Sequence, residues 1–266
     1  MTSALAQRCV EARQLAEAGD LAGAAVLFAE VLQSGDGHLR AQAALGLAVV
    51  LEDSGDADGA RRADWAAIES GDPEYAPRAG YHLALACERA GDTAGAAEAW
   101  RLVVGFGNDT YLPPAYLALA QLADDEGDFE SARDWWERVV ATGDEQYAPV
   151  AAHDLAQRLL ERGQAARAQT ILAGVLRSMD RDGYAYARLA VTMGLAHLEQ
   201  AIGAFTAALG AGAAPDVAPL AVELLARTLP LRGREDEAAE VWRHGLAEPT
   251  IADQVNARLR REFTVP

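Results

Sequence analysis

The strongest constraint on this chain is a pattern of residue types that returns every 36 residues. It is clearest between residues 75 and 176, where five kinds of residue recur at this spacing. The recurring positions are Tyr75, Tyr111 and Tyr147; Pro77, Pro113 and Pro149; Leu83, Leu119 and Leu155; Gly91, Gly127 and Gly163; and Ala96, Ala132 and Ala168. Trp100 and Trp136 share one further position, which Leu172 takes in the third copy. A period of this length indicates stacked repeats rather than one globular domain.

Each period contains a glycine followed by an acid, which predicts a tight turn between two helices. Glycine takes the left-handed conformation that ends one helix. The aspartate then caps the free N–H groups at the start of the next. The pairs are Gly19-Asp20, Gly55-Asp56, Gly91-Asp92 and Gly127-Asp128, with Gly163-Gln164 as the weakest copy.

A second glycine pair separates one period from the next. Its glycines are Gly35, Gly71, Gly107 and Gly143. Three of these pairs lead into Tyr-x-Pro, and proline suits the first turn of a helix because its missing N–H costs nothing there. Each period therefore predicts a helix A, a turn, a helix B and a loop.

Apolar residues inside the predicted helices recur at helical spacing, as Leu83, Ala84 and Cys87 do on one helix A. The pattern predicts helices at about 3–18, 21–33, 38–54, 57–69, 76–90, 93–105, 113–126, 129–141, 149–162 and 165–178.

The register slips after residue 178. Ala201 and Phe205 resemble helix B positions, but they lie 69 residues after Ala132 and Trp136 instead of 72. We expect two helices with an abrupt turn near residues 195–199; the alternative is one nearly continuous helix over 186–209.

The remainder predicts a flexible loop at 210–215, a helix pair at about 216–230 and 235–247, and a last helix at about 250–262. In that helix Ile251, Val255 and Leu259 are expected to cover the open apolar end of the stack, as a capping helix must. Arg258, Arg260 and Arg261 are expected to face water.

The charge of −17 limits the classes of partner. An acidic surface repels phosphate backbones, so nucleic acid is not expected, whereas a basic protein or peptide is. Plain solubility is the simpler explanation of the charge. Cys9 and Cys87 fall in different repeats and suggest a reduced compartment, and we expect a cytoplasmic protein without a leader or membrane segment.

These residues resemble the tetratricopeptide-type helical repeat. Leu-Ala at 83–84, 119–120 and 155–156 matches its helix A step, and the turn glycines, the helix B alanines and the two tryptophans match its other positions. The period is 36 rather than 34, and the longer loop between repeats looks like that of Sel1-like repeats.

The resemblance implies an all-α, right-handed α-α superhelical solenoid of about seven helix pairs plus a C-terminal capping helix. Its expected parts are five regular repeats over 3–178, two irregular repeats over 179–247, and the capping helix and tail over 248–266.

The resemblance also implies a concave groove, lined by helix A, that binds a protein or peptide. The residues that we expect to bind a partner there are Glu52, Arg78, Tyr81, Leu85, Glu88, Arg89, Leu117, Gln121, Asp124, Asp125, His153 and Gln157, with the half-exposed Trp135 as a further anchor. For each one, an ordinary solvated helix face is the simpler explanation. A clamp for a C-terminal carboxylate is not expected, because the matching positions hold no lysine and no suitable asparagine.

No pattern in the sequence indicates catalysis, a metal or a cofactor. The five histidines are dispersed, and the run Asp124-Asp125-Glu126 lacks the alternating spacing of a calcium loop. We therefore expect a non-catalytic scaffold with an acidic groove. The alternatives are a protein that assembles with copies of itself and a sensor of a peptide or small ligand, with a pocket near Met193 to Phe205.

Overall fold

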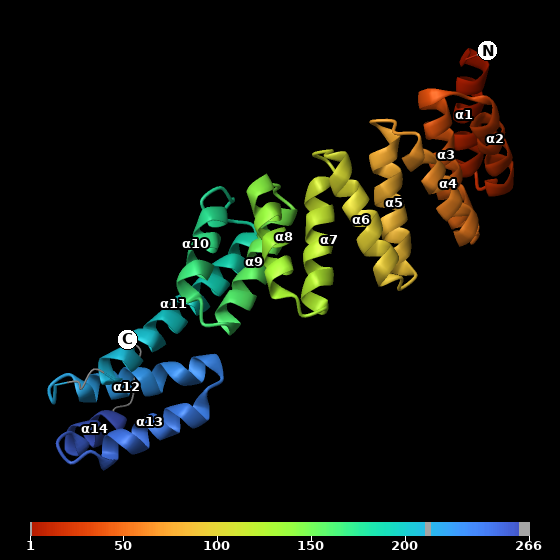
Figure 1. Ribbon diagram of the computed structural model, residues 1–266. Helices are drawn as coiled ribbons and strands as arrows, with labels where there is room; N and C mark the ends of the chain where they lie inside the picture. The colour runs from red at the N-terminus through yellow and green to blue at the C-terminus, as the bar shows by residue number, and fades with distance from the viewer. Residues whose placement is uncertain (1, 211–213, 261–266) are drawn as a thin grey trace. The chain divides into compact units, whose positions relative to one another are not determined.

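The computed structural model describes residues 2–210 and 214–260, and within these ranges all regular secondary structure is helical (Figure 1). The chain divides into two compact units, Met1–Ala148 and Pro149–Pro266, with the boundary inside helix α9 (Tyr147–Glu161). The all-α fold of repeated helix pairs that the sequence predicts is confirmed.

The first unit contains four successive helix pairs. They are α1 (Thr2–Glu17) with α2 (Leu21–Ser34), α3 (Gly37–Asp53) with α4 (Ala57–Glu69), α5 (Tyr75–Arg89) with α6 (Thr93–Phe106), and α7 (Leu112–Asp125) with α8 (Phe129–Thr142). Each helix packs on the next, and the A helices α1, α3 and α5 also contact one another in sequence. These three A helices therefore form a layer of their own.

The turn inside each pair has the predicted geometry. Gly91 has a φ of 72°, in the left-handed region where a side chain would be strained. Asp92 then accepts a hydrogen bond from the N–H of Gly95 at 2.9 Å. Asp20, Asp56 and Asp128 make the equivalent bond. In the described part of the chain Gln164 makes no such bond at the start of α10.

The tryptophans of the repeat are the largest fully buried side chains of the first unit. Trp100 and Trp136 are 2% and 1% exposed. Trp100 lies in one core with Leu83 of its own helix A and Leu119 of the next helix A. Each helix B is thus covered on two sides, and the pairs depend on their neighbours for burial.

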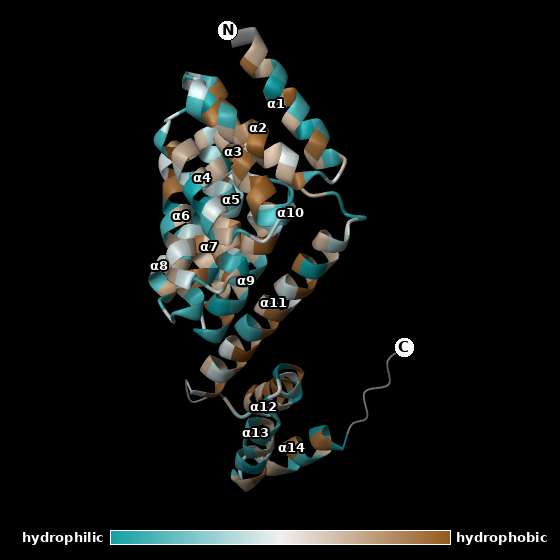
Figure 2. Ribbon diagram, turned by 90° about the vertical axis from the view of Figure 1, so that its right-hand side faces the viewer, coloured by the Kyte–Doolittle hydropathy of each residue, from teal (hydrophilic) through white to brown (hydrophobic). Residues whose placement is uncertain are grey.

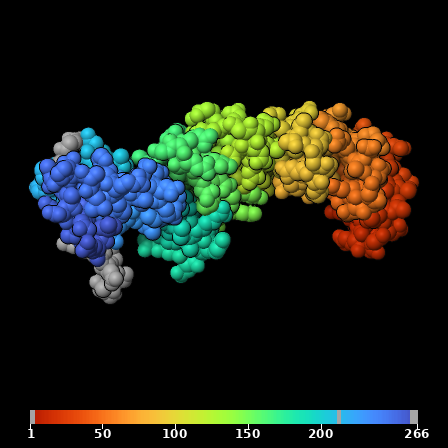
Figure 3. All heavy atoms as spheres, turned by 90° about the horizontal axis from the view of Figure 1, so that it is seen from below, coloured from red at the N-terminus to blue at the C-terminus, as the bar shows by residue number. Residues whose placement is uncertain are grey.

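The second unit contains the rest of α9, then α10 (Ala165–Leu176), α11 (Tyr184–Gly210), α12 (Ala218–Thr228), the 3₁₀ helix η1 (Leu229–Arg232), α13 (Glu235–Ala247) and α14 (Ala252–Leu259). Figure 3 shows α12 to α14, in blue, packed into one mass. No described helix, α11 included, has the length and hydropathy needed to cross a membrane.

The prediction of two helices with an abrupt turn near residues 195–199 is wrong. Helix α11 runs without a break from Tyr184 to Gly210. The segment lacks the Gly-Asp pair, and Leu195, Ala196 and Leu198 favour helix, so nothing in it ends the helix. The flexible loop expected at 210–215 includes residues 211–213, which lie outside the described residues.

The capping helix is partly as expected. Ile251 and Val255 are buried against Val222. Leu259, however, is 42% exposed, so the prediction that it packs on the open end is wrong. Helix α14 ends at Leu259.

The prediction that Arg258 faces water is also wrong. Its guanidinium lies 2.7 Å from the buried carboxylate of Glu223, which must be paired because a buried charge is costly alone. Arg260 is exposed, as predicted, and Arg261 lies outside the described residues.

The missing cap of α10 yields a stability prediction. We expect Gln164→Asp to raise the free energy of unfolding by about 1 kcal/mol. The new carboxylate can accept a hydrogen bond from a backbone N–H at the start of α10, as the aspartates do at the start of α2, α4, α6 and α8. Urea denaturation followed by circular dichroism measures the change. Asp128→Gln serves as the reverse control and should destabilise; a Gln164→Asp variant no more stable than the wild type would contradict the prediction.

Candidate functional site

The A-helix layer of the first unit contains a hollow of about 490 Å³. Its lining comes from α1, α2, α3, α5 and the residue before α7. The lining residues are Arg13, Ala16, Glu17, Phe28, Gln42, Leu45, Gly46, Val49, Val50, Tyr75, Arg78, Tyr81, His82 and Tyr111. We call this feature the tyrosine hollow.

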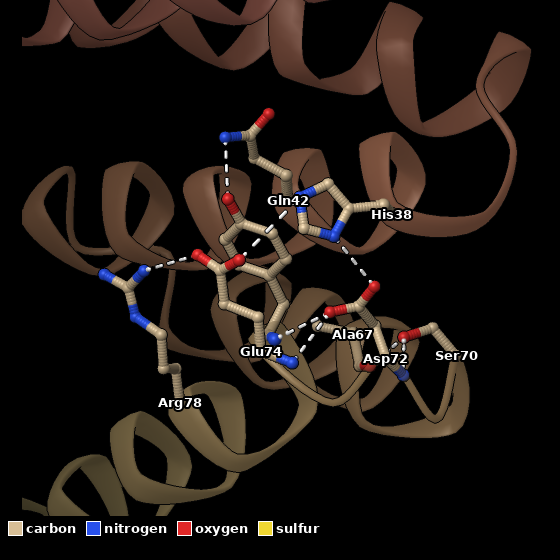
Figure 4. A network of polar contacts seen from close by, with 8 residues as sticks. His38, Gln42, Ala67, Ser70, Asp72, Glu74 and Arg78 are labelled. Atoms are coloured by element: carbon tan, nitrogen blue, oxygen red, sulfur yellow. Dashed lines mark hydrogen bonds and ion pairs between the residues drawn. The ribbon is translucent and has the colours of Figure 1, made fainter. Parts of the chain in front are cut away.

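Three tyrosines form one wall of the tyrosine hollow. Tyr81 lies 5.3 Å from Tyr111 between ring centroids and meets the buried Trp100 edge-on at 5.4 Å. The hydroxyl of Tyr75 accepts a hydrogen bond from Nε2 of Gln42 at 2.8 Å (Figure 4). Burial raises the pKa of Tyr75, so its hydroxyl stays neutral. The wall is therefore aromatic, with polar edges.

The loop before α5 fixes Tyr75 in place. The carboxylate of Asp72 accepts hydrogen bonds from the N–H groups of Glu74 and Tyr75, each at 3.0 Å (Figure 4). It also lies 3.0 Å from Nδ1 of His38, whose ring contacts that of Tyr75. Burial acts to raise the pKa of Asp72, but these bonds lower it by more. The repeated Gly-Asp loop thus holds an aromatic side chain in the wall of the tyrosine hollow.

A charged network lies beside the tyrosine hollow. His82, on its lining, is placed between two carboxylates: Nδ1 lies 2.9 Å from Asp64, and Nε2 lies 2.8 Å from Glu52. Glu52 also pairs with Arg89. Burial lowers the pKa of His82, but the hydrogen bond and charge of Asp64 and the charge of Glu52 raise it by more, and Arg89 opposes them. The His82 ring therefore links α3, α4 and α5.

Asp64 is fully buried, which makes the network costly to break. Burial raises the pKa of its carboxyl, and His82 opposes that effect. Both of its carboxylate oxygens lie close to Nδ1 of His82, at 3.0 and 2.9 Å. Removing the imidazole would leave a buried acid without its cation.

The structure brings some of the predicted partner-binding residues together. Arg78 and Tyr81 line the tyrosine hollow, and Glu52 and Arg89 lie in the adjacent network. Glu88, Gln121 and Asp125 line a smaller hollow of about 250 Å³ between α5 and α7.

Other predicted residues have structural contacts. Glu88 accepts a hydrogen bond from the indole N–H of the buried Trp100 at 2.7 Å. Leu85 is half-buried against the core, and Leu117 is only 9% exposed. Trp135 stacks on Tyr116 at 5.7 Å, with the guanidinium of Arg138 at 4.7 Å from its ring.

Asp124 lies on α7 beside Asp125. Two further predicted residues, His153 and Gln157, belong to the second unit. His153 is buried, and its Nδ1 lies 2.9 Å from the hydroxyl of Thr192 on α11. Burial lowers the pKa of His153 and the charge of Arg188 adds to this, so the ring is neutral. Gln157 is exposed on the same helix. Whether any of these residues binds a partner stays a prediction.

Sequence reasoning missed most of the tyrosine hollow. Tyr75 and Tyr111 carry the 36-residue pattern, but their spacing indicated only where a helix starts. Arg13 and Phe28 belong to the first pair, where the pattern is weakest. The signal that could have found Arg13 is its place on helix A, 36 residues before Val49, which also lines the hollow; Phe28 lies on helix B, α2.

The structure gives little support for a metal site or for the small-ligand pocket near residues 193–205. Within residues 2–210 and 214–260 no group of three or more histidines, cysteines and acids could hold a metal ion. A hollow of about 750 Å³ in the second unit is lined from α12, α13 and the ends of their neighbours, including Leu209, Val222 and His244. It does not involve residues 193–205, so the small-ligand alternative placed there stays a prediction.

Comparison with known proteins identifies the repeat. The family model described as a tetratricopeptide repeat-like domain matches residues 62–226. The chain belongs to this family. Tetratricopeptide repeat-like proteins are generally non-catalytic scaffolds that bind other proteins. The match covers the regular repeats from residue 62 onward and the segment in which the register slips.

Solved structures with a similar fold share little sequence with this chain. MamA is 18% identical over 62% of this chain and 92% of its own, with a TM-score of 0.47. PilF of Pseudomonas aeruginosa is 12% identical over 98% and 99%, with a TM-score of 0.47. BtubC from P. vanneervenii is 15% identical over 99% and 92%, with a TM-score of 0.45. No curated protein matches the chain significantly.

The two tryptophans give a prediction about paired positions. Asp124 in the fourth pair lies one 36-residue period after Glu88, and its side chain is one methylene shorter. The buried indole N–H of Trp136 has no hydrogen-bond partner among the described residues. We expect Asp124→Glu to supply that bond and to stabilise the unit by about 1 kcal/mol. Slower hydrogen exchange of the Trp136 indole N–H measures it directly.

The reverse substitution, Glu88→Asp, is the matched control for Asp124→Glu. It should expose the Trp100 indole N–H to faster exchange and lower the free energy of unfolding by a similar amount. Unchanged exchange at Trp136 in Asp124→Glu would show that the longer side chain does not reach the indole.

The network at His82 predicts a dependence of stability on pH. The pKa of His82 in the folded protein lies above the ordinary value of about 6.5. The stabilisation that His82 contributes is therefore complete below about pH 6.5 and is lost as the pH rises through the pKa of the folded state. We expect the free energy of unfolding of the wild type to fall over this interval, and His82→Gln to lack that part of the slope. The other histidines contribute equally to both proteins.

A direct measurement guards against a His82→Gln variant that fails to fold. The ring signal of His82 in the wild type, followed by NMR, should titrate above the value for a free histidine. A midpoint at or below that value would contradict the charged network.

Proposed function

We propose that this protein is a scaffold that binds a segment of another protein on the A-helix layer of its first unit, with the tyrosine hollow receiving an apolar side chain. The observation that supports this most is the hollow itself, whose wall is aromatic and includes the half-buried Tyr81. Aromatic side chains around a partly desolvated depression are typical of the positions that dominate binding energy.

The charges around the tyrosine hollow favour a basic flank in the partner. The hollow contains Arg13, Arg78 and Glu17, so its own lining has no acidic excess. The acidic residues Glu52 and Asp125 lie near the C-terminal ends of α3 and α7, where the helix dipole is also negative. We propose that the segment places an apolar side chain in the hollow and basic residues along these helix ends.

The proposal can be tested with a random peptide library displayed on phage. The wild-type protein should enrich peptides with one large apolar residue and an arginine or lysine nearby. We expect Tyr81→Ala to weaken an enriched peptide by about tenfold or more, because it removes the aromatic wall between the rings of Tyr111 and Trp100.

Tyr116→Ala is the control for this experiment. Tyr116 is also half-buried and stacked on an aromatic ring, but it does not line the hollow. Its substitution should leave the peptide affinity within about twofold. No enrichment, or equal binding to the wild type and Tyr81→Ala, would overturn the proposal. Cytoplasmic location and self-assembly through the repeats stay predictions from the sequence.

A further inference from the structure

Helix α11 contains a sixth copy of two core positions of the repeat. Counting on by 36 residues, Ala187 follows Ala79, Ala115 and Ala151, and Val191 follows Leu83, Leu119 and Leu155. In the three earlier copies the alanines are 0% exposed and the leucines at most 4%. In α11 Val191 is 66% exposed, and Ala187 is exposed too.

The lost turn explains why these positions are uncovered. In the earlier copies helix B folds back onto helix A, as α6 does on α5, and it buries Leu83 beside Trp100. In the sixth copy the helix B positions, Ala201 and Phe205, continue along the same helix as Val191. A straight helix cannot pack on itself, so the first half of α11 lacks the cover that its sequence pattern requires.

The uncovered residues form one face of α11. Tyr184, Ala187, Val191, Gly194 and Leu198 follow each other at spacings of three and four residues, which places them on one side of a helix. We call them the α11 stripe. Tyr184 is 84% exposed, and Leu198 is half-buried. The opposite face, with Leu189, Thr192 and Ala196, is buried. Figure 2 shows brown, hydrophobic residues recurring along α11.

The α11 stripe has no charged residue, although the chain carries a charge of −17. Helix α11 contains two charged residues, Arg188 and Glu199, which pair with Asp154 at 3.7 Å and Arg232 at 2.6 Å. A basic partner attracted by the acidic surface would find no acid on the stripe. Two copies of this chain, which repel elsewhere, can meet here without bringing like charges together.

The order of side-chain sizes along the stripe also suits a second copy. The stripe has a large side chain at each end, Tyr184 and Leu198, a small residue next to each of these, and Val191 in the middle. The order of sizes is therefore the same in both directions. In an antiparallel pair Tyr184 of each copy lies near Leu198 of the other. The small Ala187 and Gly194 then face each other and let the helices approach, as a self-complementary two-fold contact requires.

We infer that a second copy of this chain covers the α11 stripe, in an antiparallel pair of α11 helices with Val191 at the two-fold axis. The stripe belongs to the second unit, so this pairing is independent of the tyrosine hollow in the first.

The mass of the full chain in solution tests the pairing. Analytical ultracentrifugation over a wide range of concentration should show a reversible dimer for the wild type. Val191→Glu should weaken the dimer by about a hundredfold or more, because two carboxylates would face each other at the axis without water. The variant should fold normally, since residue 191 is exposed in the single chain and glutamate favours helix.

Val26→Glu is the matched control, because Val26 on α2 is 59% exposed and lies outside the stripe. It should leave the dimer intact. A wild type that is monomeric at all concentrations, or a dimer that persists in Val191→Glu, would overturn the inference.

A cysteine at the axis tests the orientation. Val191→Cys should form a disulfide between two copies under mild oxidation, because symmetry places residue 191 against itself; the native Cys9 and Cys87 are buried. Val26→Cys should not form one. A dimer in which Val191→Cys does not cross-link would exclude the antiparallel pair.

Discussion

The structure of this chain depends on one constraint: a single pair of helices cannot bury its own apolar surface. A helix B places a large apolar side chain between the helix A before it and the helix A after it, as Trp100 lies between Leu83 and Leu119. Burial is therefore shared between neighbours, and the 36-residue period repeats the same contact. The Gly-Asp turns make the contact possible, because they reverse the chain in a few residues.

The fold could be predicted because its determinants are local. A left-handed glycine and an aspartate cap act within a few residues, so Gly91-Asp92 has the same meaning wherever it occurs. Two helices were expected in place of the continuous α11, which was the alternative, because the pattern of Ala201 and Phe205 indicates a helix B but not whether a turn precedes it. The ion pair of Arg258 with Glu223 was not predicted because it joins residues on different helices with no regular spacing.

The candidate site could be predicted only in part, for the same reason. Tyr81 and Arg78 were found because helix A faces the groove in the related repeats. The wall of the tyrosine hollow also needs Tyr111 from the next period and Arg13 from a weak first one. Two of the acids predicted to contact a partner also stabilise the fold. Glu88 accepts a hydrogen bond from Trp100, and Glu52 pairs with His82. A side chain on the exposed face of helix A can thus be fixed by the core behind it.

The placement of His82 between Asp64 and Glu52 has a mechanical consequence. Arrays of this kind ordinarily fray from their ends, one hairpin at a time, because each hairpin touches only its neighbours. The half-buried ring of His82, which contacts carboxylates of α3 and α4 from its place on α5, fastens the second hairpin to the third. Local unfolding that starts at the N-terminus should therefore stop at these contacts of His82. The result would be a partly unfolded protein in which the remaining hairpins keep their structure.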